Sequence, residues 1–114
     1  MEQETPPERA TGLGASRIPG GLAVSGAIDI ATWPALADLL RDLAVSATTG
    51  EIVLDLSGVT FIDSHGTEMI ARLARDLGQG RRLVVRGAPP PMLRIADILH
   101  LDREPRLAIE APSA

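Results

Sequence analysis

A short polar turn, Asp63-Ser64-His65-Gly66, holds the residues best suited to chemistry in this sequence. It lies between an apolar run that begins near Glu51 and an amphipathic helical pattern that ends near Gly78. A hydroxyl at such a strand-to-helix junction lies where backbone N–H groups have no partner within the helix and favour negative charge. The turn is therefore the first candidate for a functional site.

The same turn offers little to an enzyme. A nucleophilic serine needs a base within hydrogen-bond reach and a third group that orients the base. His65 follows Ser64 directly, and neighbouring residues at a helix start diverge in direction, so we do not expect a hydrolytic dyad. An enzyme, such as a nucleotide hydrolase, is the weakest hypothesis, supported only by the acidic residues of the turn. We expect no catalytic activity.

The composition excludes several other classes of site. The chain has no cysteine, and His65 and His100 are its only histidines, so disulfides, thiolate catalysis and cysteine- or histidine-rich metal sites are not available. The sequence contains neither a complete dinucleotide-binding glycine motif nor a phosphate-binding loop with Gly-Lys-Ser/Thr. We therefore expect no metal and no cofactor.

Charge and length indicate a small protein that acts in the cytoplasm. The 114 residues suffice for one domain, and 45% of them are apolar. No apolar run approaches the length of about 20 residues needed to span a bilayer, and the acidic N-terminus lacks the features of a secretion signal. Fifteen acidic residues against eleven basic ones, with only Trp33 and Phe61 as aromatics, argue against nucleic acid as a partner. We expect a cytoplasmic protein that contacts neither membranes nor nucleic acid.

Apolar periodicity predicts an α/β domain between two short tails. Thr32 is the expected N-cap of the first helix, with Pro34 in its first turn. The predicted segments, in order, are a disordered tail at 1–12, strands at 13–18 and 22–28 forming a hairpin, a helix from 33 to about 46, a strand at 52–56, the helix after the polar turn, a strand at 82–86, a loop at 87–91, a helix at 92–99, a strand at 107–109 and a tail at 111–114.

The strands have one apolar face and one more polar face. Ile52, Leu54 and Leu56 alternate with Val53 and Asp55, and the other strands follow the same rule. Helices are therefore expected mainly on one face of the sheet. This differs from a doubly wound nucleotide-binding fold, in which both faces are covered.

One stretch of the chain resembles a known family. Residues 55–66, DLSGVTFIDSHG, are similar to the signature of the STAS domain of bacterial anti-sigma-factor antagonists. Residues 25–29, SGAID, resemble the segment after that family's second strand, and residues 92–102 resemble its third helix and the segment that follows. The resemblance implies a STAS-like single domain at 13–110, with a mixed, mostly parallel sheet, an N-terminal hairpin and helices mainly on one face.

The resemblance also implies a function by partner switching. In that family the serine after the aspartate is phosphorylated by a partner that is both a serine kinase and an anti-sigma factor, which implies Ser64 as the phosphoacceptor. The unphosphorylated protein would bind this partner and the phosphorylated protein would release it, with a phosphatase as a further partner. The implied partner-binding residues are Asp29, Asp63, His65, Gly66, Thr67 and Glu68.

Plainer interpretations of these residues remain open. Ser64 could serve only as the N-cap of its helix, and Asp29 and Asp63 could be ordinary turn residues. Glu68 could pair with Arg72 four residues further along the helix. His65 stands where the family usually has Ser or Thr, and Thr67-Glu68 replaces Leu-Gly. The alternative function is a constitutive scaffold or ligand-sensing STAS module that is never phosphorylated.

Overall fold

The computed structural model describes residues 12–46, 50–78 and 80–110. Apart from Gly12, the two predicted tails lie outside these residues. The elements, in chain order, are β1 (Leu13–Ile18), β2 (Gly21–Ile28), α2 (Trp33–Ser46), β3 (Glu51–Ile62), α3 (Ser64–Asp76), β4 (Arg82–Arg86), α4 (Pro90–Ile98), the short 3-10 helix η1 (Leu101–Arg103) and β5 (Leu107–Ile109).

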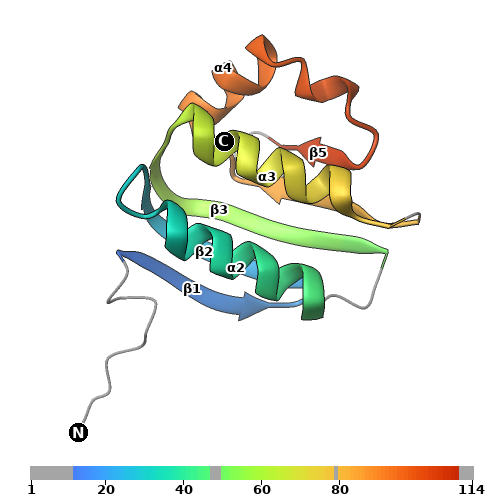
Figure 1. The fold of residues 1–114 in the computed structure, drawn as a ribbon, viewed down its shortest axis with the longest axis horizontal. Helices are drawn as coiled ribbons and strands as arrows, with labels where there is room; N and C mark the ends of the chain where they lie inside the picture. The colour runs from blue at the N-terminus through green and yellow to red at the C-terminus, as the bar shows by residue number, and fades with distance from the viewer. Residues whose placement is uncertain (1–11, 47–49, 79, 111–114) are drawn as a thin grey trace, which may run out of the picture.

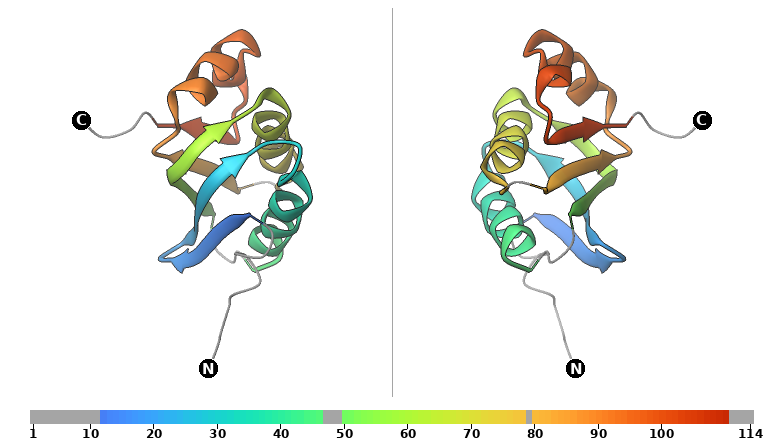
Figure 2. Two further views of the ribbon diagram at one scale, coloured as in Figure 1. Left: turned by 90° about the vertical axis from the view of Figure 1, so that its left-hand side faces the viewer. Right: turned by 90° about the vertical axis from the view of Figure 1, so that its right-hand side faces the viewer.

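The strands form a single five-stranded sheet in the order β1-β2-β3-β4-β5 (Figure 1). β1 and β2 make the predicted antiparallel hairpin, and every later pairing is parallel. Figure 2 shows α2 and α3 side by side against one face of the sheet, with α4 beyond α3. The mixed, mostly parallel sheet with helices mainly on one face is as predicted.

The core lies between the sheet and these helices. Ile52, Leu54 and Leu56 of β3 are fully buried there, together with Leu36 of α2 and Ile70 of α3. The alternation within the strands thus identified the covered face correctly. Burial of these side chains supplies the main stabilisation of the domain, at roughly 25 cal/mol for each Å² of apolar surface removed from water.

The polar face of the sheet is less open than its alternation predicted. Val53 and Val84 are buried there, although no helix lies over that face among the described residues. The two valines are paired in register on the central strands β3 and β4, so each shields the other. Farther along the same strands Asp55 lies opposite Arg86, and this part of the face is polar as expected.

Two predicted boundaries are wrong in an informative way. β3 does not end at Leu56 but continues to Ile62, because β2 follows it with two register shifts and keeps pairing until Ile28 meets Ile62. α4 begins at Pro90, inside the predicted loop, since the first turn of a helix tolerates the missing N–H of proline. The longer β3 places the polar turn directly after the last residue pair of β2 and β3, at the carboxyl ends of these two strands.

Candidate functional site

Asp63 is the single residue between the end of β3 and the start of α3. Its backbone N–H donates to Ile28 O at 3.2 Å, its side-chain Oδ1 accepts from Gly66 N at 2.7 Å, and its carbonyl accepts from Thr67 N at 3.0 Å. Asp63 is therefore the N-cap of α3, and Ser64 is the first helical residue. The interpretation of Ser64 as the N-cap is wrong, because the Asp63 side chain, one residue earlier, accepts the hydrogen bond from Gly66 N.

Ser64 is exposed at the first position of α3. Within the described part of the chain, the backbone N–H groups of Ser64 and His65 have no acceptor, as expected for the first turn of a helix. The Ser64 hydroxyl is therefore accessible from solvent and lies beside two free backbone donors. An anionic group added to this hydroxyl would meet the positive end of the helix dipole.

Trp33, the first residue of α2, lies against the same turn. Its indole N–H donates to both carboxylate oxygens of Asp63, at 3.2 Å to Oδ1 and 3.1 Å to Oδ2. Its ring also contacts the His65 imidazole, with the centroids 4.0 Å apart and the planes tilted by 44°. Sequence reasoning missed this role of Trp33, and a single tryptophan at a helix start gives no signal that could have revealed it.

Asp29 and Asp63 both lie at the carboxyl ends of their strands, because β2 and β3 end side by side. It begins a turn in which its carbonyl accepts from Thr32 N and Trp33 N, each at 2.9 Å, and its Oδ1 accepts from Ala31 N at 3.0 Å. Thr32 precedes α2 as expected, but its hydroxyl donates back to Ala27 O at 2.8 Å. Thr32 thus ties the turn to β2 through its side chain, and we find no side-chain cap from it to α2 among the described residues.

The remaining predicted partner-binding residues differ in accessibility. Thr67 is 0% exposed, and its hydroxyl donates to Asp63 O at 3.0 Å. Gly66 is buried against Ile28. Both residues are buried in the free chain and pack the helix start against the sheet. That they contact a partner stays a prediction.

Glu68 is half-buried on the outer side of α3. Its carboxylate pairs with Arg75 at 2.5 Å and not with Arg72, so the predicted i,i+4 pair is replaced by one that spans two turns. The Glu68 side chain remains 39% exposed in this pair.

Apolar surface adjoins the turn. Ile30, next to Asp29, is 73% exposed, and Phe61, two residues before Asp63, is 44% exposed. A groove of about 460 Å³ between α2 and α3 starts at His65 and Glu68 and has Leu40 among its apolar lining residues. The turn is thus bordered by surface of the kind that protein partners bury.

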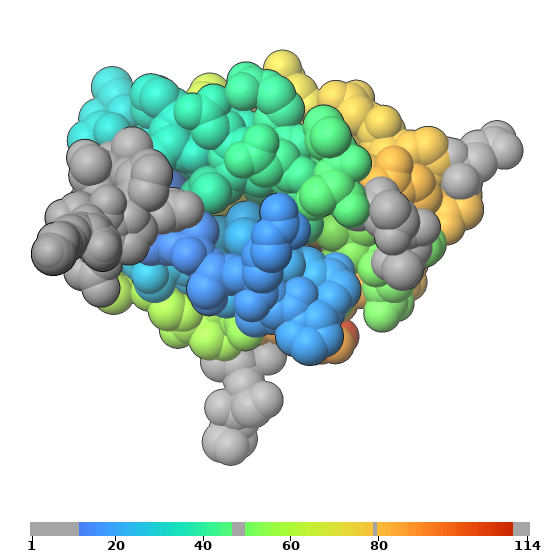
Figure 3. Space-filling view, turned by 90° about the horizontal axis from the view of Figure 1, so that it is seen from below, coloured from blue at the N-terminus to red at the C-terminus, as the bar shows by residue number. Residues whose placement is uncertain are grey.

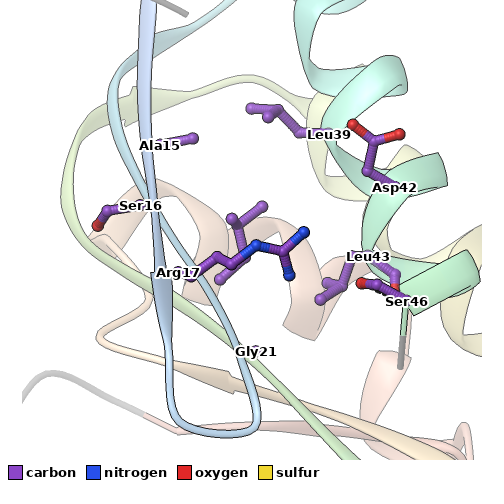
Figure 4. Close-up of a pocket in the computed structure, with 9 residues that line it drawn as sticks. Ala15, Ser16, Arg17, Gly21, Leu39, Asp42, Leu43 and Ser46 are labelled. Carbon is purple, nitrogen blue, oxygen red and sulfur yellow. Dashed lines mark hydrogen bonds between the residues drawn. The ribbon is translucent and has the colours of Figure 1, made fainter. Parts of the chain in front are cut away.

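A second cavity, of about 190 Å³, lies away from this turn, between β1 and the C-terminal half of α2. Figure 3 shows the adjoining surfaces of the hairpin and α2, and in Figure 4 the Arg17 guanidinium points toward α2. Leu39, Asp42 and Ser46 line the cavity from the helix. None of the residues of the polar turn takes part in it.

Within the described residues, no three potential metal ligands lie together. No helix in this part of the chain is both long and apolar enough to cross a membrane.

Comparison with known proteins gives two kinds of match. The family model described as "Mlab, STAS domain" matches residues 11–109. A solved anti-sigma factor antagonist from Mycobacterium paratuberculosis is similar over 84% of this chain and 83% of its own, with 29% identity and a TM-score of 0.68. The structure of the anti-sigma factor antagonist SpoIIAA in its unphosphorylated form matches 89% of each chain with 11% identity and a TM-score of 0.61. The fold predicted from the motif is confirmed.

Proposed function

The chain belongs to the STAS domain family, and from that membership we propose that it is an anti-sigma-factor antagonist that works by partner switching. Unphosphorylated, it binds an anti-sigma factor with serine kinase activity. Phosphorylated on Ser64, it releases that partner, and a phosphatase resets it. The general role is supported by the similarity to the antagonist from Mycobacterium paratuberculosis. The chain is the kinase's substrate and has no catalytic role of its own, and we place the exchange in the cytoplasm.

One observation carries the assignment of Ser64. Its hydroxyl is exposed at the first position of α3, beside two backbone N–H groups that have no acceptor among the described residues. A phosphate adds a charge of about −1.5 to −2, which a helix N-terminus stabilises by roughly 0.3–1 kcal/mol at an exposed position. The fold therefore tolerates the modification without rearrangement.

The partner experiences the modification differently. The switch surface, defined as Asp29, Asp63, Ser64, His65 and Glu68, already carries three carboxylates. A partner that docks here fits the unmodified Ser64 hydroxyl, and a phosphate places a bulky, strongly hydrated group with a charge of about −1.5 to −2 beside these carboxylates at the centre of the contact. Burying that charge in the interface costs binding free energy. A change of about 1.4 kcal/mol in binding free energy lowers affinity tenfold. Phosphorylation thus releases the partner while the antagonist stays folded.

The assignment is tested by incubating the protein with its cognate anti-sigma kinase and Mg-ATP, followed by mass spectrometry of the peptides. We expect one phosphate, on Ser64, and none on Ser64→Ala. Absence of phosphate from Ser64, or an equal amount of phosphate on the Ser64→Ala variant, would rule out this site.

The second candidate function is a constitutive STAS module that binds its partner without phosphorylation. The observation that favours it is His65, whose ring lies against Trp33 next to Ser64 and which a kinase must accommodate. A pull-down of the partner distinguishes the two functions. Equal capture by the wild-type protein and by Ser64→Asp supports the constitutive module, whereas loss of capture by Ser64→Asp supports the switch.

A further inference from the structure

We propose that Trp33 is a positioning residue of the switch surface, which fixes the two residues on either side of Ser64. Its effect on partner binding rests on the proposed function, while its effect on the geometry of the turn does not. Trp33 does not itself belong to the motif that resembles the family signature, and it comes from a different element, α2. Trp33 can reach the turn before α3 because α2 and α3 both start at the carboxyl ends of the neighbouring strands β2 and β3.

The first contact fixes Asp63. The indole N–H donates to both carboxylate oxygens, and Oδ1 accepts at the same time from Gly66 N. A carboxylate that holds a backbone amide and an indole together has one favoured orientation, because a rotation that keeps one donor loses the other. Hydrogen bonds to a charged acceptor are stronger than those between neutral groups. The N-cap geometry that places Ser64 at the first helical position is therefore stabilised by the Gly66 N–H of α3 and also by the Trp33 indole of α2.

The second contact fixes His65. The imidazole is exposed and would otherwise sample several rotamers, but its centroid lies 4.0 Å from the Trp33 ring. The two rings are tilted by 44° and lie in direct contact at this separation. Contact with the Trp33 ring holds the His65 side chain on the side of the turn that faces α2, beside the groove that His65 helps to line.

The backbone of Trp33 adds a third link. Its N–H donates to Asp29 O at 2.9 Å, within the turn that leads from β2 into α2. The side-chain contacts of the same residue then link this turn to the turn after β3. One residue thus contacts Asp29, Asp63 and His65, three of the five residues of the switch surface. The surface is thus already ordered before a partner binds. Complex formation therefore costs less of this chain's conformational entropy than it would with a loose turn.

A first experiment tests the geometry without any partner. Trp33→Phe keeps an aromatic ring for His65 and removes the indole N–H. Amide hydrogen exchange measured by NMR should show Gly66 exchanging at least fivefold faster in this variant, relative to the amides of the central strand β4. Leu39→Ala, on α2 but away from the turn, is the control and should leave this ratio unchanged. An unchanged ratio in Trp33→Phe overturns the proposal.

A second experiment tests the consequence for function, with the purified anti-sigma kinase as the probe and affinity measured by titration calorimetry. We expect Trp33→Phe to weaken binding about fivefold, since one hydrogen bond to a charged group is lost at a partly exposed position. In the Asp63→Ala background the same change should have no further effect, because Trp33 acts through Asp63. A fivefold loss in both backgrounds would assign Trp33 to direct contact and overturn the positioning role.

The two experiments separate the two proposals. If the wild-type chain does not bind the kinase at all, the proposed function is wrong, and the exchange ratio still decides whether Trp33 positions the turn. If the wild-type chain binds and Trp33→Phe binds equally well, the function stands and the positioning role is wrong.

Discussion

Asp63→Ala should destabilise the protein well beyond an ordinary surface substitution. The Asp63 side chain caps α3 through Gly66 N and accepts the Trp33 indole N–H. Loss of an N-cap costs about 1 kcal/mol, and loss of a hydrogen bond to a charged group costs about 1.5 kcal/mol. Because both bonds use one carboxylate they are lost together, so we expect the free energy of unfolding to fall by about 2.5 kcal/mol. For a domain of this size that lowers Tm by roughly 10 °C.

Urea denaturation followed by circular dichroism measures this loss, because Trp33 fluorescence is itself altered by the substitution. Asp63→Asn keeps both an N-cap and an acceptor oxygen, so it should cost only about 0.5–1 kcal/mol. Asp29→Ala removes one bond to Ala31 N at an exposed position and should cost about 0.5 kcal/mol. The reasoning fails if Asp63→Ala lies within about 0.5 kcal/mol of the wild type, or if Asp63→Asn is equally damaging.

Three further substitutions probe the turn and the two elements that flank it, β3 and α3. Gly66→Ala should lower Tm, because its Cβ would lie 2.5 Å from a buried methyl group and overpacking costs about 1–3 kcal/mol, whereas Gly78→Ala, whose Cβ has nothing within 4 Å, serves as a neutral control in the same thermal scan. The pKa of Asp55 is held below its usual value, mainly because the Ser57 hydroxyl donates to its carboxylate and secondly because the Ser57 N–H does so too. Since that pKa is lower in the folded chain than in the unfolded one, the stabilisation is complete at neutral pH and is lost as the pH falls below about 4. When Tm is measured against pH, Ser57→Ala should therefore lose less stability on acidification than the wild type. An identical dependence of Tm on pH in the two proteins would contradict this. Glu68→Gln should change the unfolding free energy by less than about 1 kcal/mol in urea, because its ion pair is 39–40% exposed, and a larger loss would show that the pair is worth more than its exposure implies.

The sequence predicted the sheet and the order of its elements because alternation and helical periodicity are local signals. The face formed by Ile52, Leu54 and Leu56 and the helix stripe that includes Ile70 followed directly from these patterns. The end of β3 did not, because its last residues are held by pairing with β2 through two register shifts. A register shift is a tertiary feature, and a single strand's sequence does not encode it.

The candidate site was predicted in its position and only partly in its composition. The motif located Ser64 and Asp63, and the topology placed Asp29 at the same edge of the sheet. The buried position of Thr67 and the contacts of Trp33 depend on how α2 and α3 pack together, which no local pattern reveals. Side-chain contacts between elements therefore marked the limit of sequence reasoning in this domain.

The most direct test of the proposed switch compares the affinity of the anti-sigma kinase for the unphosphorylated chain and for the chain phosphorylated on Ser64. Titration calorimetry with a non-hydrolysable ATP analogue keeps the two forms separate during the measurement. We expect phosphorylation to weaken binding by at least about tenfold, an effect of ~1.4 kcal/mol, while the circular dichroism spectrum stays unchanged. Equal affinity of the two forms would contradict partner switching.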